Sequence, residues 1–384
     1  MTRPIRFNRP SIEGHELDYI RAAVEGGHTS SSGPFGSKVA ALLREFHGAA
    51  DVLLTTSCTD ALEMSAMMLD LGPGDVVVVP SFTFVSTALA FARQGATLRF
   101  CDIEPLTLGL DPVRLEELMD ERVKAVVTVH YAGVGSDLIG IQAVLARWPR
   151  AELIEDNAHG LFGRYRGRPL GSFGRFSTLS FHETKNFICG EGGALVVNRA
   201  SDVDRAHVLL DKGTDRRAFL LGQVDKYSWR DIGSSFGLSD VLASYLWGQL
   251  EQRDRILARR REVFERYQAA LEPHAAELGF RLPVVPGDRE QAYHMFYVLL
   301  RDRQQRDAVL TYMSERQVQA TFHYVPLHSS EAGGRFTDRP ADCPVTERVS
   351  DTLLRLPFYN DLDGETAEVV IRTFLDAVRA SERR

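Results

Sequence analysis

A lysine between a short apolar segment and a glycine-rich turn is the first residue in the chain whose setting indicates chemistry. Lys185 follows Leu179 and Phe181, and it precedes a turn over residues 190–193 that leads into an apolar run. Both flanks would bury the backbone around the lysine. A buried lysine loses its proton more easily and can form a Schiff base with an aldehyde. An ordinary solvated loop lysine is the alternative.

A second stretch supplies an acidic partner for this amine. Residues 152–155 are typical of a buried strand, and Asp156 follows at its end, before small residues that open a turn. Ligands of parallel sheets bind at the carboxyl ends of strands. Pyridoxal 5'-phosphate (PLP) needs a lysine for the Schiff base and an anion that keeps its ring nitrogen protonated. Lys185 and Asp156 together therefore predict a PLP site, although Asp156 alone would fit a turn or helix cap.

Several segments resemble the PLP motifs of the nucleotide-sugar aminotransferases of the DegT type, a branch of the aspartate aminotransferase fold. The resemblance runs from Phe7 to Tyr359 and is strongest to the dTDP-4-amino-4,6-dideoxygalactose transaminases. The motifs that carry it are Glu155-Asp156-Asn157-Ala158-His159, Ser180-Phe181-His182-Glu183-Thr184-Lys185, Gly190-Glu191-Gly192-Gly193, Thr56-Ser57-Cys58-Thr59, Pro80-Ser81-Phe82-Thr83-Phe84-Val85-Ser86-Thr87 and the stretch 222–235.

The resemblance implies a fold, which is α/β with PLP-dependent fold type I. A large PLP-binding domain, residues 1–245 including an N-terminal arm, would contain a mostly parallel sheet. A smaller α+β domain, residues 246–384, would follow, with a long helix over 239–271 as the bridge. Enzymes of this family form homodimers with shared active sites, so a homodimer is expected here.

The resemblance also implies a set of cofactor-binding residues. Each has a structural alternative, such as a helix cap for the serines and threonine or core packing for the phenylalanine. Ser235 stands where many relatives have an asparagine that reaches the partner's cofactor phosphate, and its side chain is shorter. The set comprises Ser57, Cys58, Thr59 and Ser180 at the phosphate, Phe84 over the ring, His159 beside it, Asp156, Lys185 and Ser235.

Substrate-binding residues are expected in three further segments. A turn-rich loop over 30–36, a charged and aromatic segment over 213–235, and a stretch ending near residue 328 match substrate-side regions of the family. A plain connector, a solvated basic face or a strand end would explain the same residues. The candidates are Phe35, Lys226, Tyr227, Arg230, His323, Tyr324 and His328.

The expected reaction is PLP-dependent transamination of dTDP-4-keto-6-deoxy-D-glucose, with L-glutamate as amino donor, in O-antigen or enterobacterial common antigen biosynthesis. Another nucleotide keto-sugar, with a 3-keto group or a UDP or GDP carrier, is an alternative, as is a non-catalytic sugar sensor on the same fold. A nicotinamide enzyme is disfavoured because Leu138 replaces the third glycine of its motif. No metal site is expected, because residues 182–186 begin like H-E-x-x-H but end in Asn186.

Composition restricts partners and location. The chain has 384 residues, 44% of them apolar and 25% charged, and its net charge of −7 disfavours nucleic acid and anionic membranes as partners. Four scattered cysteines form no disulfide or zinc pattern. The opening residues, Met1 to Arg6, lead into no apolar leader, and no apolar run approaches the ~18 residues of a membrane span. We expect a cytoplasmic protein.

The elements that must position these residues follow a βα rhythm. Strands are predicted over 52–55, 76–79, 97–101, 123–129, 152–155 and 194–197, with helices between most of them, which favours a parallel sheet covered on both faces. A helix capped by Ser11 is expected to bury Leu17, Ile20 and Val24. The C-terminal part is predicted to contain strands over 294–300 and 319–324 and helices over 307–314 and 365–380.

Overall fold

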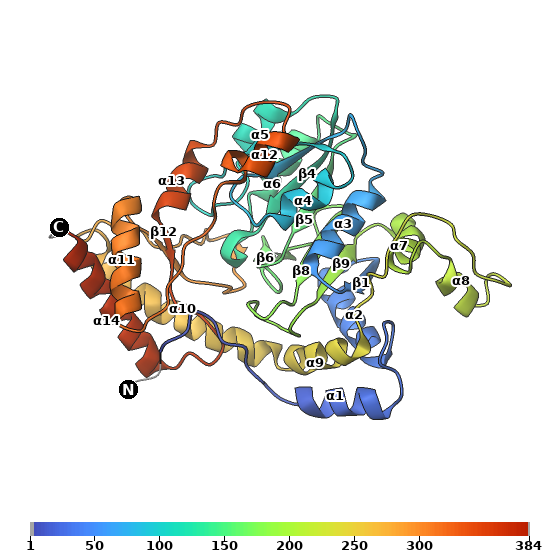
Figure 1. The fold of residues 1–384 in the computed structure, drawn as a ribbon, viewed down its shortest axis with the longest axis horizontal. Coiled ribbons are helices and arrows are strands. Elements are labelled where there is room, and N and C mark those ends of the chain that lie inside the picture. Colours follow the sequence, from blue (N-terminus) through green and yellow to red (C-terminus); the bar gives the residue numbers. More distant parts are fainter. Residues whose placement is uncertain (1–3, 383–384) are drawn as a thin grey trace.

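The computed structural model describes residues 4–382 and contains a seven-stranded central sheet (Figure 1). Neighbouring strands are parallel except around β9, which is antiparallel to both of its neighbours. The mostly parallel α/β architecture predicted from the sequence is therefore confirmed. In spatial order the strands are β1 (Asp51–Thr55), β9 (Gly193–Val197), β8 (Phe176–Ser180), β5 (Glu152–Asp156), β4 (Val123–Val129), β2 (Val76–Pro80) and β3 (Thr97–Cys101).

Helices cover both faces of this sheet because its strands are apolar on both sides. Val77 and Val79 of β2 pack in one core cluster, whereas Val76 and Val78 pack in another on the opposite face. The first cluster includes residues of α3 (Cys58–Met68), α4 (Ser86–Ala92) and α7 (Val203–Leu210). The second cluster includes residues of α5 (Pro112–Leu118) and α6 (Leu138–Leu145). A third cluster contains residues of α2 (Pro34–His47) and α9 (Asp240–Glu251).

A separate core cluster fills the C-terminal part of the chain. It includes residues of β11 (Tyr297–Leu299) and β12 (Leu353–Arg355), which pair antiparallel, and of α10 (Arg253–Ala275), α11 (Arg303–Glu315) and α14 (Gly364–Ser381). Leu246 and Leu250 still belong to the cluster around α2, and Val263 is the first member from α10 in the C-terminal cluster. The division into domains at residue 245 stays a prediction.

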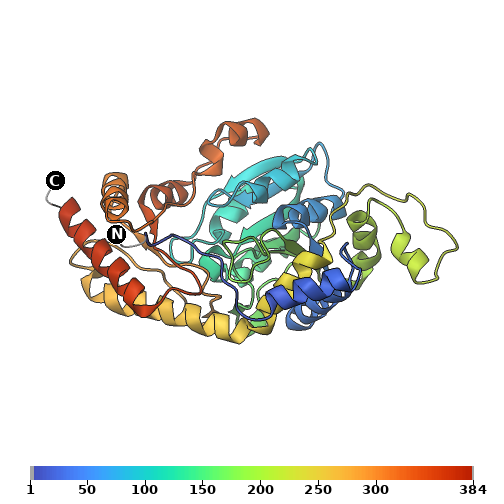
Figure 2. The same cartoon turned by 60° about the horizontal axis from the view of Figure 1, so that its bottom comes forward.

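Short elements complete the fold. The charged and aromatic segment over residues 213–235 contains the five-residue helix α8 and projects from the body (Figure 2). Among the described residues, no helix combines the length and apolarity needed to cross a membrane. The remaining elements are α1 (Glu16–Glu25), α8 (Arg216–Leu220), α12 (Glu331–Phe336), α13 (Pro344–Thr352), β6 (Arg164–Tyr165), β7 (Arg168–Pro169), β10 (Arg289–Glu290) and the 3-10 turns Tyr131–Gly133, Ala200–Asp202 and Leu327–Ser329. Of the opening residues, Met1 to Arg3 lie outside the described part.

The buried face predicted for the first helix is wrong. Leu17 and Val24 are 58% and 55% exposed, and the side of α1 that meets α9 carries Glu16 and Ala23 instead. The Glu16 carboxylate accepts hydrogen bonds from two backbone N–H groups and from Gln249 Nε2 of α9. These charge-assisted bonds fix the rotation of the helix against its apolar pattern.

Two further predictions differ from the structure. The helix expected over 239–271 is two helices, α9 and α10, separated at Gln252, where the backbone leaves helical geometry (φ −100°, ψ 13°). Residues 319–324 do not form the expected strand: Thr321 makes only an isolated bridge to Arg355 of β12, and the preceding Val318 makes one to Ile5. In Figure 1, α9 and α10 follow one another along the bottom of the molecule and connect the sheet to the C-terminal core.

Candidate active site

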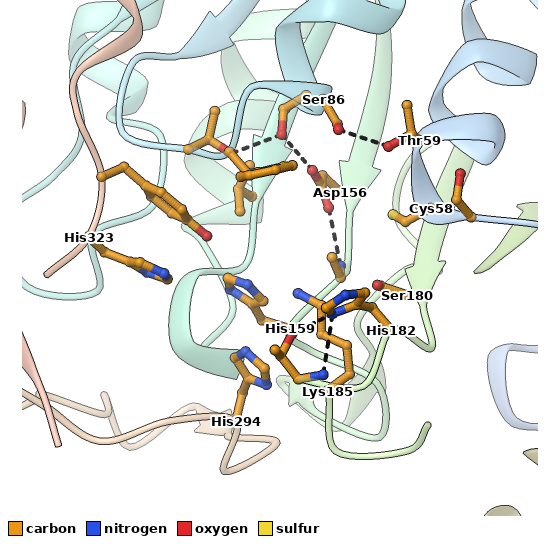
Figure 3. Close-up of a pocket in the computed structure, with 18 of the residues that line it drawn as sticks. Cys58, Thr59, Ser86, Asp156, His159, Ser180, His182, Lys185, His294 and His323 are labelled. Atoms are coloured by element: carbon orange, nitrogen blue, oxygen red, sulfur yellow. Dashed lines mark hydrogen bonds between the residues drawn. The ribbon is translucent and has the colours of Figure 1, made fainter. Parts of the chain in front are cut away.

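A cavity of about 630 Å³ opens at the carboxyl ends of the central strands and is closed on one side by the C-terminal part of the chain (Figure 3). Ten of the residues predicted from the sequence line it: Ser57, Cys58, Thr59, Phe84, Asp156, His159, Ser180, Lys185, His323 and Tyr324. The βα rhythm explains the grouping, because parallel strands end at the same edge of the sheet.

Asp156 is the last residue of β5, and only 5% of its surface is exposed. Its Oδ2 accepts a hydrogen bond from Thr87 Oγ1 at 2.7 Å, and its Oδ1 accepts one from the Ala158 N–H at 3.2 Å. Burial raises the pKa of Asp156, since it removes water from the carboxylate. A protonated ring nitrogen in the cavity would offset that cost by supplying a charge-assisted hydrogen bond.

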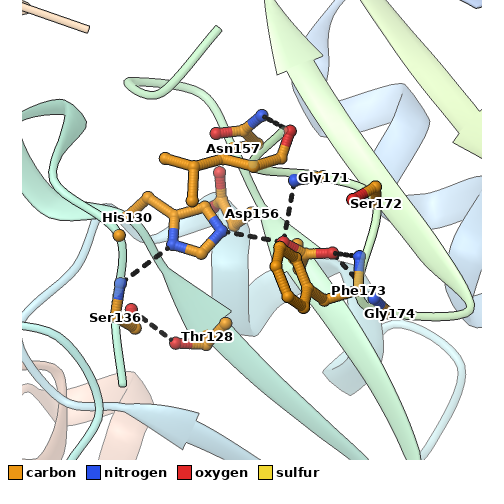
Figure 4. A network of polar contacts seen from close by, with 12 residues as sticks. Thr128, His130, Ser136, Asp156, Asn157, Gly171, Ser172, Phe173 and Gly174 are labelled. Carbon is orange, nitrogen blue, oxygen red and sulfur yellow. Dashed lines mark hydrogen bonds and ion pairs between the residues drawn. The ribbon is translucent and has the colours of Figure 1, made fainter. Parts of the chain in front are cut away.

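The side chain of the neighbouring residue, Glu155, lies on the other face of β5, because side chains alternate along a strand, and it organises the loop that leads into β8. Figure 4 shows Gly171, Phe173 and Gly174 of this loop near His130. Its carboxylate accepts N–H groups of Gly171, Phe173 and Gly174 at 2.7–2.8 Å and His130 Nε2 at 3.0 Å. Burial would raise the pKa of Glu155, but these hydrogen bonds lower it, so the carboxylate stays ionised. His130 is thus part of this support.

Lys185 lies in a tight loop between β8 and β9. The backbone N–H of Lys185 donates a hydrogen bond to the His182 carbonyl at 2.9 Å, and the Phe181 carbonyl accepts one from the backbone N–H of Cys189. Within residues 4–382 its amine makes no hydrogen bond. Burial lowers the pKa of Lys185 to about 8, which leaves a substantial neutral fraction near physiological pH.

The N-terminus of α3 forms the opposite wall of the cavity. Ser57 caps the helix by accepting the Asp60 N–H, and the hydroxyls of Thr59 and Ser86 lie 2.8 Å apart. A Cβ on Gly193 of β9 would lie 2.4 Å from the Cys58 nitrogen, so only glycine permits this approach. Free N–H groups at a helix N-terminus beside hydroxyls make an anion site, and they fit a phosphate.

His159 offers an unsatisfied nitrogen to the cavity. Its ring stacks on that of His294 with centroids 4.2 Å apart, and His294 Nδ1 contacts Asn186 Oδ1 at 3.0 Å. Burial lowers the pKa of both histidines, so both rings are neutral. His159 Nδ1 is buried and has no partner in the described structure. A buried polar atom of this kind indicates a ligand, and it fits the phenolic oxygen of PLP.

Another wall contains a residue that the sequence did not single out, Arg355 of β12. Its Nη1 donates to His323 Nε2, while His323 Nδ1 lies 3.2 Å from the Tyr131 hydroxyl. The ring of His323 stacks on Tyr324 at 3.8 Å. The signal available in the sequence was a lone charge inside the apolar run 353–358, which would bury it.

The other candidate residues do not line this cavity within one chain. Phe35 packs against Tyr19 in the hydrophobic layer of α1, α2 and α9, and His328 Nδ1 contacts Ser81 Oγ at 2.6 Å. Ser235 forms a bridge with Asp211. The remaining candidates, Lys226, Tyr227 and Arg230, lie on the projecting segment (Figure 2). Their roles stay predictions.

The fit to PLP is good, because the cavity offers an amine, a buried carboxylate, a helix N-terminus and an unpaired imidazole nitrogen. Lys185 would hold the aldehyde carbon and Asp156 the ring nitrogen, with the α3 N-terminus and Ser180 at the phosphate. The thiol of Cys58 is no competing nucleophile, because burial raises its pKa to about 12.

Comparisons with known proteins agree with this geometry. The spore coat polysaccharide biosynthesis protein SpsC of Bacillus subtilis (strain 168) is 31% identical over 393 residues, covering 98% of this chain and 97% of SpsC. The crystal structure of the aminotransferase TlmJ from Streptoalloteichus hindustanus matches with a TM-score of 0.90 at 31% identity, over 98% of this chain and 99% of TlmJ. Spr1654 from Streptococcus pneumoniae in its PLP form has a TM-score of 0.90 at 22% identity, over 98% and 99% of the two chains, which shows the shared fold alone.

The match to a family description covers residues 10–375, which is nearly the whole described chain. The predicted cofactor, PLP, and the predicted fold type I are confirmed by the match to an aminotransferase family over these residues and by the similarity to TlmJ at 31% identity. The chain belongs to the DegT/DnrJ/EryC1/StrS aminotransferase family, and it is a PLP-dependent enzyme of the sugar aminotransferase class.

Proposed function

We propose that the protein transfers the amino group of L-glutamate to C4 of dTDP-4-keto-6-deoxy-D-glucose and so forms dTDP-4-amino-4,6-dideoxy-D-galactose. The observation that carries the transamination is the meeting of Lys185, Asp156 and the α3 N-terminus in one cavity. The choice of sugar is supported by the resemblance of residues 80–87 and 222–235 to the dTDP-sugar transaminases. The role of SpsC in spore coat polysaccharide biosynthesis is in keeping with a sugar substrate.

Each residue of the cavity has a defined task in this reaction. PLP, when bound, supplies an electron sink that acidifies the carbon next to the transferred nitrogen. Asp156 would accept a hydrogen bond from the ring nitrogen and keep it protonated. Nζ of Lys185 takes the proton from the α-carbon of glutamate. In the second half-reaction it delivers a proton to C4 of the sugar. His159 Nδ1 and the N–H groups of α3 orient the ring.

A substrate panel tests the sugar assignment. The holoenzyme is incubated with L-glutamate and with nucleotide keto-sugars that differ in keto position and in carrier, dTDP, UDP or GDP, and the products are identified by mass and NMR. The proposal expects the 4-amino-4,6-dideoxygalactose product from the dTDP 4-keto-6-deoxy substrate. Preferential amination of a 3-keto sugar, or of a UDP- or GDP-linked sugar, would contradict the proposed substrate and assign that sugar in its place. The Lys185→Ala variant is the blank, with no turnover and no visible absorbance from a lysine-linked cofactor.

We also propose a cytoplasmic homodimer in which the projecting segment of one subunit reaches the cavity of the other. Six large apolar side chains of this segment are at least 40% exposed: Phe219, Leu220, Leu221, Tyr227, Trp229 and Ile232. Such a cluster is costly in water unless a partner covers it. The arrangement would bring Lys226, Tyr227 and Arg230 to the partner's substrate, where the basic side chains suit a diphosphate.

Subunit mixing tests this arrangement. Lys185→Ala and Arg230→Ala homodimers are each expected to be nearly inactive with the nucleotide sugar. Dissociated and reassociated together, they would form heterodimers with one intact site, and activity would return. A monomer by light scattering, or no recovery despite heterodimers being formed, would contradict the proposal.

A further inference from the structure

The side chain of Asn186, the residue that follows Lys185, is buried and makes two hydrogen bonds. Only 5% of the residue is exposed. Its Nδ2 donates to the Ala292 carbonyl at 2.6 Å, and its Oδ1 lies 3.0 Å from Nδ1 of His294. Both partners lie more than 100 positions further along the chain. The two contacts therefore join the loop of the lysine to a distant segment.

The same two contacts determine where the ring proton of His294 lies. A carbonyl oxygen is an acceptor only, so the group that faces the Ala292 carbonyl must be the amide nitrogen of Asn186. The amide oxygen then faces His294 and needs a donor, which is Nδ1–H. Burial lowers the pKa of His294 well below its ordinary value, so the ring is neutral and carries one proton. Nε2, which makes no hydrogen bond within residues 4–382, is left as an acceptor.

The backbone around His294 is held as well as its ring. The His294 carbonyl accepts a hydrogen bond from Nη2 of the buried Arg260 at 2.6 Å, and Nε of the same arginine donates to the Tyr293 carbonyl at 2.7 Å. The backbone N–H of Ala292 donates to the Gly133 carbonyl at 2.9 Å. Since His294 is buried, its ring cannot turn without leaving buried polar groups unpaired.

The ring of His294 supports a residue of the predicted cofactor site, His159. The two ring centroids are 4.2 Å apart and the planes differ by 13°, which is a face-to-face stack. Nδ1 of His159 is the buried, unpartnered nitrogen that fits the phenolic oxygen of PLP. Figure 3 shows both rings near Lys185, and together with Asn186 they line a second, much smaller cavity. Asn186 thus reaches His159 through His294.

We propose that Asn186 is a positioning residue for two groups that would contact PLP. Its backbone is continuous with that of Lys185, and its amide holds His294 in one orientation and one tautomer, on which His159 stacks. A change at this position would displace the amine and the imidazole together. The inference rests on the proposed roles of Lys185 and His159 toward PLP, and it does not depend on the choice of sugar or carrier.

Nitrogen NMR of histidine-labelled holoenzyme tests the tautomer without turnover. The ring nitrogens of the two neutral tautomers differ widely in chemical shift. The wild type is expected to show His294 with its proton on Nδ1, and the signal is assigned by its loss in His294→Phe. Asn186→Leu keeps the volume of the side chain, and in this variant the signal should move toward the other tautomer. A wild-type His294 with its proton on Nε2 would contradict the inference.

Cofactor binding and kinetics measure the consequence for the site. In Asn186→Leu we expect the Kd for PLP, from titration of the apoprotein, to rise about 10- to 100-fold, and kcat of the donor half-reaction to fall by a similar factor. The KM for the donor should change less than threefold, because neither side chain is proposed to bind it. His294→Phe keeps a ring for His159 but lacks the Nδ1 donor, so it should reproduce most of both losses.

Asn198→Ala is the matched control for the loss of a buried amide. Nδ2 of Asn198 also donates to backbone carbonyls, those of Gly171 at 2.9 Å and Gly174 at 2.8 Å, but the residue lines neither cavity. This variant should lower Tm while the Kd for PLP and kcat change less than twofold. Losses in Asn198→Ala as large as those in Asn186→Leu would mean that general destabilisation is sufficient, against the inference.

The double variant Asn186→Leu/His294→Phe distinguishes action through His294 from independent effects. Both changes remove the same hydrogen bond, so the double variant should lose little more than either single one. Losses that multiply would overturn the inference, as would an unchanged Kd for PLP in a folded Asn186→Leu. If Asn186→Leu does not fold, the wild-type tautomer and His294→Phe decide. If Lys185→Ala keeps its visible absorbance, the proposed role of Lys185 is wrong, and the tautomer measurement still decides on Asn186.

Discussion

Burial sets the protonation of the side chains that surround the reacting atoms. It lowers the pKa of Lys185 and of His159, and it raises the pKa of Asp156. The first shift makes a neutral amine available and the second keeps an imidazole uncharged. The third makes Asp156 dependent on a cationic partner, which a protonated ring nitrogen provides. The cavity is therefore tuned for a cofactor that is itself charged.

The pKa of Lys185 can be read from cofactor uptake. At pH 7.5 a lysine with a pKa of about 8 is roughly one quarter neutral, against about 0.1% at the ordinary value. Since the neutral amine is the nucleophile, the rate of PLP uptake by the apoprotein should rise with pH and reach half its maximum near 8, as measured by visible absorbance. Asp156→Asn should lower this midpoint, because the carboxylate favours the ammonium form. A midpoint near 10 would contradict the burial argument.

Thr87 is expected to act through Asp156. Thr87→Val keeps the shape but removes the hydroxyl that donates to Oδ2, so the carboxylate loses its orientation. We expect kcat of the donor half-reaction to fall about 10- to 100-fold by stopped-flow absorbance, with little change in Tm. Thr87→Ser retains the hydroxyl and should recover most of the rate. Equal losses in both variants would mean that packing, not the hydrogen bond, matters at this position.

Among the elements, β9 has a special role because its first residue aligns two parts of the cavity. Gly193 pairs with Thr55 at the end of β1 and with Ser180 at the end of β8. It also lies against the backbone of Ser57 and Cys58, where a Cβ would clash. The Gly-rich motif read in the sequence thus brings the hydroxyl of Ser180 and the N-terminus of α3 to the same anion site.

Gly193→Ala should therefore weaken the binding of PLP more than it lowers the stability of the fold. Overpacking of about 1 to 3 kcal/mol corresponds to a roughly 5- to 150-fold higher Kd for PLP, measured by titration of the apoprotein. Gly72→Ala is the matched control, because a Cβ there meets no atom within 4 Å. An unchanged Kd for PLP in Gly193→Ala would show that the turn around Cys58 moves freely, against the close packing seen here.

The sequence predicted those features that depend on local pattern. Asp156 and Lys185 stand out because polar groups follow apolar strands at an edge where strand ends meet. Arg355 does not stand out, since its burial beside the cavity, with no carboxylate partner among residues 4–382, is visible only after β12 is placed. The buried face of α1 was predicted wrongly, because the hydrogen bonds of the buried Glu16 carboxylate set the rotation of the helix and leave Leu17 and Val24 exposed. The break between α9 and α10 could not be predicted either, because residue 252 is a glutamine and not a glycine or proline.

At the scale of the whole molecule, a buried charge network holds the C-terminal part against the sheet. Arg99 of β3 is fully buried, and it contacts Asp120 at 2.7 Å and Asp338, which follows α12, at 2.9 Å. The hydrogen bond from Arg99 lowers the pKa of Asp338, so this carboxylate stays ionised. The network joins residues that lie more than 200 positions apart in the chain.

Arg99→Met is expected to lower the free energy of unfolding by about 2 to 4 kcal/mol in urea titrations, because it removes the buried cation and leaves Asp120 and Asp338 paired only with the more exposed Arg122 and Arg339. Because the folded pKa of Asp338 is depressed, this contribution is present above pH ~4 and is lost as the pH falls further. The difference between wild type and variant should thus shrink on acidification. Arg261→Met removes an exposed pair with Glu265 and should change stability by less than about 0.5 kcal/mol.

The cavity takes Lys185 and Asp156 from the sheet side but Arg355 from the C-terminal core, and the two sides are not equally visible in solution. All three tryptophans, Trp148, Trp229 and Trp247, lie outside the C-terminal core. Intrinsic tryptophan fluorescence therefore reports on the sheet side and misses a loosening around β12. An enzyme warmed until the structure around β12 loosens can therefore keep an unchanged emission spectrum, so thermal inactivation must be followed by activity as well as by fluorescence.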